Sequence, residues 1–415
     1  MSSSLPPVVN TVVKWFNERT PGLMPVYRKH LSEYYAPKNF NFWYYFGSLA
    51  MLVLVNQLVT GIWLTMFYKP SAAEAFASVE YIMRDVEWGW LIRYMHSTGA
   101  SAFFVVVYLH MFRALIYGSY QKPREIVWIL GMLIFLVLMA EAFMGYVLPW
   151  GQMSYWGAQV IINLFGAIPF EIGDVLTEWI RGDYLVSDAT LNRFFALHVV
   201  ALPMVLLLLV VLHLGALHEV GSNNPDGVDI KKKKGPDGKP LDGIAFHPYY
   251  TVKDIVGVGF FLTIAAFIVF FAPTFGDLFL EYDNFIPADP MVTPEHIKPV
   301  WYFTPYYAML RAVPDKLFGV IVMGGAVMIL FLLPWLDRSP VKSVRYRGWI
   351  FKLLVTLFVI AFVILGWLGM QSGSEAQTLW ARILTFYYFA FFITMPVWTR
   401  FDATKPVPDR VTTHD

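Results

Sequence analysis

The chain contains no cysteine in its 415 residues. It therefore forms no disulfide, ligates no iron–sulfur cluster through thiolates and has no Cys-x-x-Cys-His site for covalent haem attachment. Any metal bound by this chain must be held by histidine or by oxygen ligands.

Charge is also scarce. Charged residues make up 15% of the chain, apolar residues make up 57%, and the formal net charge is +1. A soluble globular protein carries roughly 25% charged residues, so this chain has too few to cover a water-facing surface. These values exclude an ordinary soluble enzyme, a disordered chain and a protein that binds nucleic acid through charge. They favour a polytopic helical membrane protein.

We expect no cleavable signal in the N-terminal region. A polar, amphipathic stretch from Val9 to Phe40 precedes the first long apolar run, which begins near Phe42. We expect residues 1–42 to form an amphipathic segment that lies on the membrane surface.

Apolar runs of about twenty residues recur along the chain, and each is long enough to cross a bilayer as a helix. The predicted fold is an all-α polytopic membrane protein with eight transmembrane helices, at about 43–67, 90–112, 127–148, 196–217, 255–275, 318–336, 349–370 and 379–399. The links 149–195 and 276–317 are rich in Trp, Tyr, Pro and Gly, which favours interfacial helices and packed loops. The lysine-rich stretch 231–239 is predicted to be a solvated loop.

Lysine and arginine are distributed unevenly between the two sides of this topology. The side that carries the N-terminus holds 22 of the 31. Because cytoplasmic loops carry the excess of these residues, an even number of spans places both termini in the cytoplasm.

Four of the nine histidines lie inside apolar spans. His96 and His110 are 14 residues apart on the second span, and His198 and His213 are 15 apart on the fourth. Fourteen residues end about 40° short of four full turns and rise about 21 Å, so two such histidines face nearly the same way at two depths. The two spans run in the same direction, which matches His96 with His198 in depth, and His110 with His213.

Neutral imidazole is a common ligand of haem iron, and two pairs of facing histidines would hold two b-type haems stacked across the bilayer. The alternative is that each histidine is a hydrogen-bonded packing residue. The match of four histidines into two pairs favours the haem sites.

Glycines repeat the histidine spacing on the first and third spans. The two pairs, each 14 residues apart, are Gly47 with Gly61 and Gly131 with Gly145. Glycine supplies the clearance that a flat porphyrin needs between helices, although it is also frequent at contacts between membrane helices. Arg93 and Arg113 each lie three residues from a histidine and are candidate partners of haem propionates.

Four longer motifs indicate a family. They are Gly-Tyr-Val-Leu-Pro-Trp-Gly-Gln-Met at 145–153, His-Glu-Val-Gly-Ser-Asn-Asn-Pro at 218–225, Phe-His-Pro-Tyr-Tyr-Thr-Val-Lys-Asp at 246–254 and Pro-Val-Trp-Tyr at 299–302. In this order they resemble cytochrome b of the respiratory cytochrome bc complex, complex III. The resemblance runs from about residue 27 to residue 400, and the uninterrupted chain differs from the split photosynthetic relative.

The resemblance implies a quinol:cytochrome c oxidoreductase that works by the Q cycle. Ubiquinol would be oxidised at an outer, periplasmic-side site, with one electron passing to a Rieske iron–sulfur protein and on to a c-type cytochrome. The other electron would cross the membrane through a low-potential and then a high-potential haem to a quinone at an inner, cytoplasmic-side site. The cycle would contribute to the proton-motive force.

Matched residue by residue, the resemblance assigns ligands and quinone sites. His96 and His198 would ligate the low-potential haem, and His110 and His213 the high-potential haem. The outer quinol pocket would be lined by Phe143, Tyr146, Met153, Gly157, Pro299, Trp301, Tyr302 and Tyr307. The inner quinone site would use His218, Ser222, Lys253 and Asp254, with His218 and Asp254 as a pair that delivers protons.

The sequence departs from the family at the outer site. The family usually has Pro-Glu-Trp-Tyr there, and its glutamate takes a proton from quinol, whereas this chain has Val300. We expect Glu141 to replace that glutamate, because an ionisable residue inside a span is a functional hypothesis by default. Glu295 is the rival acceptor, although it could equally be a solvated loop carboxylate. A route through water, with Glu141 as a structural partner only, is the remaining alternative.

A second departure is the 15-residue spacing between His198 and His213, where the respiratory family usually shows 14. The extra residue overshoots four turns by about 60°. Pro203 lies between them, and a kink or local over-winding there would absorb the rotation.

The competing functions are a proton-coupled secondary transporter and the di-haem anchor subunit of a dehydrogenase. Transporters typically show inverted repeats and broken helices, which this sequence lacks. Anchor subunits usually have fewer spans and lack the motifs at 145–153 and 299–302.

The predicted organisation has four parts. Residues 1–42 form the surface segment, 43–254 a di-haem four-helix bundle with the inner-site loop, 255–400 the C-terminal helices with the outer-site loop, and 401–415 a cytoplasmic tail. The Rieske protein and the c-type cytochrome must be separate chains, because this chain has no cysteine. We expect a homodimer of the complex in a bacterial inner membrane, with no nucleic-acid partner.

Overall fold

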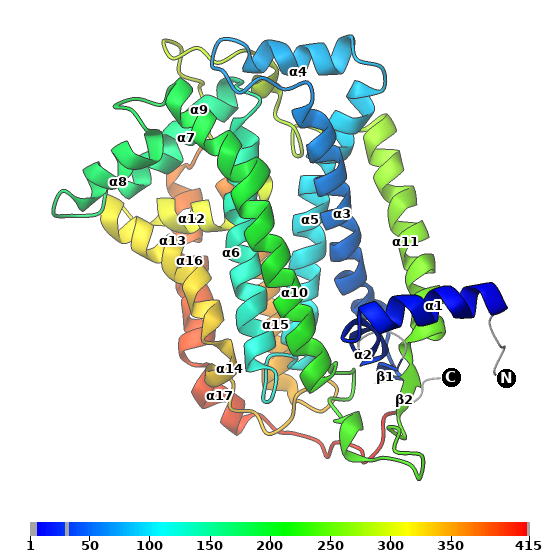
Figure 1. Cartoon of the computed structure of the whole chain (residues 1–415). Helices are drawn as coiled ribbons and strands as arrows, with labels where there is room; N and C mark the ends of the chain where they lie inside the picture. Colours follow the sequence, from blue (N-terminus) through cyan, green and yellow to red (C-terminus); the bar gives the residue numbers. More distant parts are fainter. Residues whose placement is uncertain (1–5, 30–32, 413–415) are drawn as a thin grey trace.

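The computed structural model describes residues 6–29 and 33–412. These residues form helices and one short two-stranded sheet. Long helices run side by side between two ends of the molecule (Figure 1). We call these the α1 end, where α1 (Pro7–Arg19) lies, and the α4 end, where α4 (Ala75–Arg84) lies.

Each predicted span has a helical counterpart. These are α3 (Tyr45–Thr65), α5 (Gly89–Tyr117), α6 (Glu125–Val147), α9 (Asp188–Ala196) continuing through η3 (Leu197–Ala201) into α10 (Leu202–Val220), α11 (Phe246–Phe271), α13 (Lys316–Phe331), α15 (Trp349–Gly369) and α16 (Glu375–Ile393) with α17 (Met395–Phe401). Six of them are long and apolar enough to cross a membrane, and α16 and α17, which are bent by 63° to each other, make a seventh when they are taken as one span. The chain is therefore a multi-pass membrane protein. The eighth span stays a prediction, because α13 has only 16 residues.

The helices that carry the span histidines each pack against a helix that carries the matching glycines. α3 packs against α5, and α6 packs against α10. Buried residues of α5 and α6 form one apolar core with α12 (Thr304–Ala312), α15 and α16. The lipid-facing sides are also apolar, as on α11, where Val256, Phe260 and Phe267 are exposed.

The two long links contain packed helices, as the composition predicted. α7 (Gln152–Phe165) and α8 (Ile172–Arg181) lie in the first link, and α12 lies in the second. The stretch 231–239 is mostly exposed, as expected for a solvated loop.

The N-terminal region is partly as predicted. α1 lies across the long helices and α2 (Leu23–Tyr27) follows it (Figure 1). The strand β1 (Tyr35–Pro37) then pairs antiparallel with β2 (Gly243–Ala245), a contact that sequence periodicity did not indicate. Residues 1–5 and 30–32 of the predicted surface segment lie outside the described residues.

One predicted boundary falls inside a helix. α11 begins at Phe246, nine residues before the predicted span, so the division at residue 254 falls inside this helix. Lys253 and Asp254 therefore lie on a helix and not in a loop, because the polar motif at 246–254 continues directly into the apolar run.

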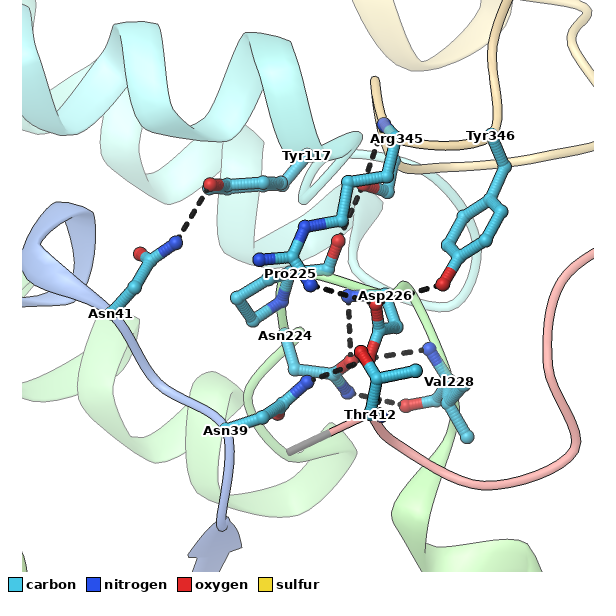
Figure 2. A network of polar contacts seen from close by, with 11 residues as sticks. Asn39, Asn41, Tyr117, Asn224, Pro225, Asp226, Val228, Arg345, Tyr346 and Thr412 are labelled. Atoms are coloured by element: carbon cyan, nitrogen blue, oxygen red, sulfur yellow. Dashed lines mark hydrogen bonds and ion pairs between the residues drawn. The ribbon is translucent and has the colours of Figure 1, made fainter. Parts of the chain in front are cut away.

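A buried carboxylate joins distant segments at the α1 end (Figure 2). Asp226 accepts hydrogen bonds from Asn39, Arg345, Tyr346 and Thr412. Burial alone would raise the pKa of Asp226, but bonds from Thr412, Tyr346 and Arg345 hold that pKa below its usual range. The described C-terminal residues are thereby fixed at the end where α1 lies.

Candidate functional site

The four span histidines meet in two opposed pairs. The ring centres of His96 on α5 and His198 on η3 are 6.2 Å apart, and those of His110 on α5 and His213 on α10 are 6.5 Å apart. An iron atom between two imidazoles places the ring centres roughly 6 Å apart, because each metal–nitrogen bond is about 2 Å long and each centre lies about 1 Å further out. In each pair, the two imidazoles are therefore at a separation at which they would hold one metal ion between them.

Each histidine also faces a glycine on the neighbouring helix. A Cβ added to Gly47 would lie 3.5 Å from the ring of His110, and one added to Gly61 would lie 3.1 Å from that of His96. The same holds for Gly131 against His213, at 3.3 Å, and for Gly145, whose Cβ would lie 3.0 Å from both ring nitrogens of His198. The glycines thus leave room for the imidazoles as well as for a flat group between the helices.

Hydrogen bonds orient His96 and His198, which are the histidine pair nearer the α4 end. Nδ1 of His96 lies 2.9 Å from the Thr60 hydroxyl, and Nδ1 of His198 lies 2.9 Å from the Glu141 carbonyl oxygen. The Glu141 carboxylate is also 3.0 Å from Nδ1 of His198. Partners of this kind fix a histidine ring and leave Nε2 to bind metal.

The extra residue between His198 and His213 is absorbed by a π-turn. η3, which contains His198, is a π-helical turn, and Pro203 follows it at the start of α10. A π-turn inserts one residue by widening the helix locally. The expected over-winding is therefore wrong, since the helix is locally under-wound, and the position of the irregularity beside Pro203 is as expected.

The two arginines lie beside the histidine pairs. Arg93 lines the cavity at the α4 end, and its guanidinium makes no hydrogen bond or ion pair within the described chain. Arg113 lies 3.3 Å from Nδ1 of His110 and packs over the ring of Tyr44. A buried cation with spare donors suits a carboxylate-bearing ligand.

A cavity at the α4 end extends from the first histidine pair to the loop between α11 and α12. Its lining includes the residues around the first histidine pair, which are His96, His198, Gly145, Glu141 and Arg93. It also includes Tyr146, Phe279, Leu280, Asn284, Val300 and Tyr302. A largely apolar slot with a few polar groups suits a quinone ring.

The remaining residues predicted for the outer pocket lie around this cavity without lining it. Met153 is buried in α7, and Phe143 packs edge-on against Phe194. The Trp301 indole donates to Ser101. Gly157, Pro299 and Tyr307 are partly buried, and the Tyr307 ring lies under the Arg311 guanidinium.

Sequence reasoning missed a carboxylate in the same region. Glu281 is 4% exposed and accepts a hydrogen bond from the Tyr146 hydroxyl, and the Lys298 ammonium is 3.9 Å away. Burial raises the pKa of Glu281 to about 7, against the opposing effects of Tyr146 and Lys298. The signal was present in the sequence, as an acid within the otherwise apolar run 278–282.

The two carboxylates that were predicted occupy different settings. Glu141 lines the cavity, with one carboxylate oxygen against His198 and the other without a partner among the described residues. Glu295 is exposed and does not line the cavity, as expected for a solvated loop carboxylate.

At the α1 end, the predicted inner-site residues lie on three elements. His218 stacks on Tyr34, with ring centres 4.3 Å apart, and the Tyr34 hydroxyl is 3.2 Å from that of Ser222. Lys253 lies over Tyr249, and Asp254 faces Ser48 of α3. No contact between His218 and Asp254 is seen in the described part of the chain, so their pairing stays a prediction.

Two family models match the chain. Cytochrome b/b6/petB matches residues 31–221, and the C-terminal model, cytochrome b(C-terminal)/b6/petD, matches residues 287–389. The first of these covers both histidine pairs and all four facing glycines.

Relatives match over nearly the whole chain. Cytochrome b of Allochromatium vinosum is 62% identical, over 96% of this chain and 98% of that relative. Cytochrome b of Rhodospirillum rubrum is 52% identical, over 96% and 95%. A solved structure described as hyperthermophilic respiratory Complex III is 40% identical, with a TM-score of 0.85 and coverage of 94% of this chain and 99% of that one.

Proposed function

The chain belongs to the cytochrome b family of respiratory complex III, and from this premise we propose that it oxidises quinol at the α4 end and reduces quinone at the α1 end. The observation that carries the proposal is the presence of two opposed histidine pairs at two depths, each facing glycines on the adjacent helices.

We propose that each histidine pair holds one haem b. His96 and His198 would hold the low-potential haem, and His110 and His213 the high-potential haem. When bound, the haems supply one-electron transfer across the membrane. Thr60 and Glu141 orient the imidazoles, and Arg93 and Arg113 supply cations for propionates. The proposed scaffold is a four-helix bundle of α3, α5, α6 and α10 within an eight-span chain.

The proposed orientation places the α1 end in the cytoplasm and the α4 end outside, in a bacterial inner membrane. The excess of lysine and arginine on the loops of the α1 end supports it. Residues 43–254 would form the haem-binding part with the inner-site segment, and residues 255–400 the outer-site part. Residues 1–42 and 401–415 would be the cytoplasmic surface segment and tail.

We propose that quinol enters the cavity at the α4 end. Tyr146, Val300 and Tyr302 line it. The other residues proposed for the quinol pocket are Phe143, Met153, Gly157, Pro299, Trp301 and Tyr307. The apolar lining excludes water from the reacting ring, and the two tyrosine hydroxyls are the polar groups that orient it.

We propose that another group of this chain takes the proton that quinol releases, because Val300 cannot. Glu141 remains a proposed acceptor, and Glu295 is the weaker one because it lies outside the cavity lining. The contact of the Glu141 carboxylate with His198 gives Glu141 a second role, which is to hold that imidazole. Glu141→Gln is expected to slow quinol oxidation and to leave both haems in place, and near-normal turnover would refute the acceptor role.

At the α1 end, His218, Ser222, Lys253 and Asp254 are proposed to bind quinone and supply protons to it. Tyr34 supports this site by stacking on His218 and bonding to Ser222. The proposed partners are a Rieske iron–sulfur protein and a c-type cytochrome, in a homodimer of the complex, because a chain without cysteine carries neither centre.

A stepwise redox titration of the purified complex tests the proposal. Two b haems per chain that titrate at separate potentials, with ubiquinol:cytochrome c turnover, are expected. One haem or none would overturn the histidine assignment and would favour a proton-coupled transporter, in which the same histidines relay protons.

A further inference from the structure

We propose that Glu281 is the proton acceptor of the outer quinol site, reached through the hydroxyl of Tyr146. This inference rests on the proposed function and names Glu281, in place of Glu141, as the group that replaces the missing acid at Val300, because the Glu141 carboxylate is held against His198. It follows from the contacts of the loop between α11 and α12 with the end of α6.

Tyr146 connects Glu281 to the cavity. The tyrosine lies in the last turn of α6, lines the cavity and donates its hydroxyl hydrogen to Oε2 of Glu281. Phe279 and Leu280, which precede Glu281, line the same cavity. A quinol hydroxyl that reached Tyr146 would be one hydrogen-bonded step from the carboxylate.

A cluster of charged side chains connects Glu281 to the protein surface. Lys298 lies 3.9 Å from Oε1 of Glu281 and 3.0 Å from Asp277. Asp277 also accepts from the backbone nitrogen of Tyr282, which fixes the turn beside Glu281. The Asp277 side chain is 34% exposed, so this cluster joins a buried acceptor to water.

The proton step balances in the following way. The Tyr146 hydroxyl takes one proton from quinol as it gives its own to the Glu281 carboxylate, which becomes the neutral acid. Quinol gives up two protons and two electrons in becoming quinone. The route through Tyr146 carries one of these protons, and the second leaves with the electron that passes to the iron–sulfur partner, while the other electron passes to the outer one-electron carrier of the proposed function. The acid then releases the proton to water at the exposed edge near Asp277, and Lys298 stabilises the carboxylate that forms.

The electrostatic surroundings suit this task. The groups that face Glu281 are Tyr146 from α6, Lys298 and Tyr302 from the segment leading into α12, and Asp277 and Asp283 from its own loop. Burial is the largest influence and places the pKa of Glu281 at about 7. An acceptor with this pKa is deprotonated above neutral pH and still takes a proton readily.

Glu281→Gln tests the role, because glutamine keeps the size and the acceptor oxygen but takes no proton. In the intact complex we expect quinol oxidation at pH 7 to fall by about 10²-fold. Both haems should keep their number and potentials. In the unaltered complex, the rate should rise with pH up to about 7 and then level off. In the variant this rise should disappear.

Two further variants sharpen the test. Glu87→Gln makes the same chemical change at an exposed position of the α4 end and should leave rate and pH profile unchanged. Val300→Glu, introduced into the Glu281→Gln complex, should restore turnover because Val300 lines the same cavity.

The results separate this inference from the proposed function. Turnover of Glu281→Gln within twofold of the unaltered complex, with the same pH profile, would overturn the role of Glu281. The proposed function would still hold in that case, because the complex would contain two haems and oxidise quinol. If Glu281→Gln fails to assemble, Glu281→Asp and Tyr146→Phe replace it. A shifted pH profile in the first and a slowed rate in the second support the inference, and unchanged values in both overturn it. An unaltered complex without haem or quinol oxidation would refute the proposed function itself.

Discussion

Alanine substitution of the four facing glycines should remove haem in a graded order that the structure sets. A Cβ at Gly145 would lie closer to Cε1 of His198 than real Cβ contacts allow, and 3.0 Å from both ring nitrogens. The imidazole cannot turn away without losing its bonds to Glu141. At Gly47, by contrast, the Cβ would lie 3.5 Å from His110, an ordinary contact.

The expected cost follows from these distances. Over-packing of a tight site costs about 1–3 kcal/mol, and we place Gly145→Ala at the upper end of that range. Gly61→Ala and Gly131→Ala, at 3.1 and 3.3 Å, should fall between, and Gly47→Ala should cost least. Helix propensity acts in the opposite direction, since alanine favours a helix over glycine by about 1 kcal/mol. A loss of haem therefore reports the contact with histidine and not a weaker helix.

The assay is haem b per chain with a redox titration of each variant complex. Gly145→Ala should lose or shift the low-potential haem and leave the high-potential one, and Gly47→Ala should keep both. Gly259→Ala on α11 is the control, because its Cβ would meet nothing within 4 Å. Full haem content in Gly145→Ala together with loss in Gly47→Ala would refute the reasoning.

Three further predictions follow from other contacts. His96→Leu should remove only the low-potential signal, and His213→Leu only the high-potential one, in a redox titration. Thr60→Val removes the partner of His96 Nδ1 and should weaken haem retention by 10–100-fold, measured by haem loss to a scavenger. Asp226→Asn leaves Arg345 without its carboxylate and should lower stability by about 3 kcal/mol, measured by thermal inactivation. Because the folded-state pKa of Asp226 is depressed, its contribution is present above pH 3.8 and is lost as the pH falls below that value.

Local sequence patterns predicted the features that depend on a single helix. Apolar runs located the helices because a lipid-facing helix must be apolar along its whole length. The spacing of His96 and His110 placed both on one face of α5, since helical geometry alone fixes that relation. The matching glycines on α3 and α6 followed from the same periodicity, and the structure sets each of them against a histidine.

Features that depend on contacts between distant segments were not predictable in this way. Glu281 acquires its setting from Tyr146, which lies 135 residues away in the chain, so its loop sequence alone gives only an acid among apolar neighbours. The π-turn at His198 was missed because an extra residue can be absorbed by tighter or wider winding, and periodicity does not distinguish the two. The pairing of β1 with β2 lacked a signal because each strand has only three residues.

The meeting of chain segments at the α1 end has a consequence for synthesis. Asp242, just before β2, binds Lys38 beside β1 and also Arg410, which follows it by 168 residues. During translation, Lys38 can therefore pair with Asp242 only after the middle of the chain has been made. The contact of Asp242 with Arg410 forms only when Arg410 has left the ribosome. Until then, the Asp242 carboxylate lacks its contact with Arg410, and the segments around β1 and β2 are accessible to insertion factors and proteases. A ribosome stalled before Arg410 should accordingly yield a chain that is cut near residues 38–45 and 242–245, whereas the completed chain resists cleavage at these two places.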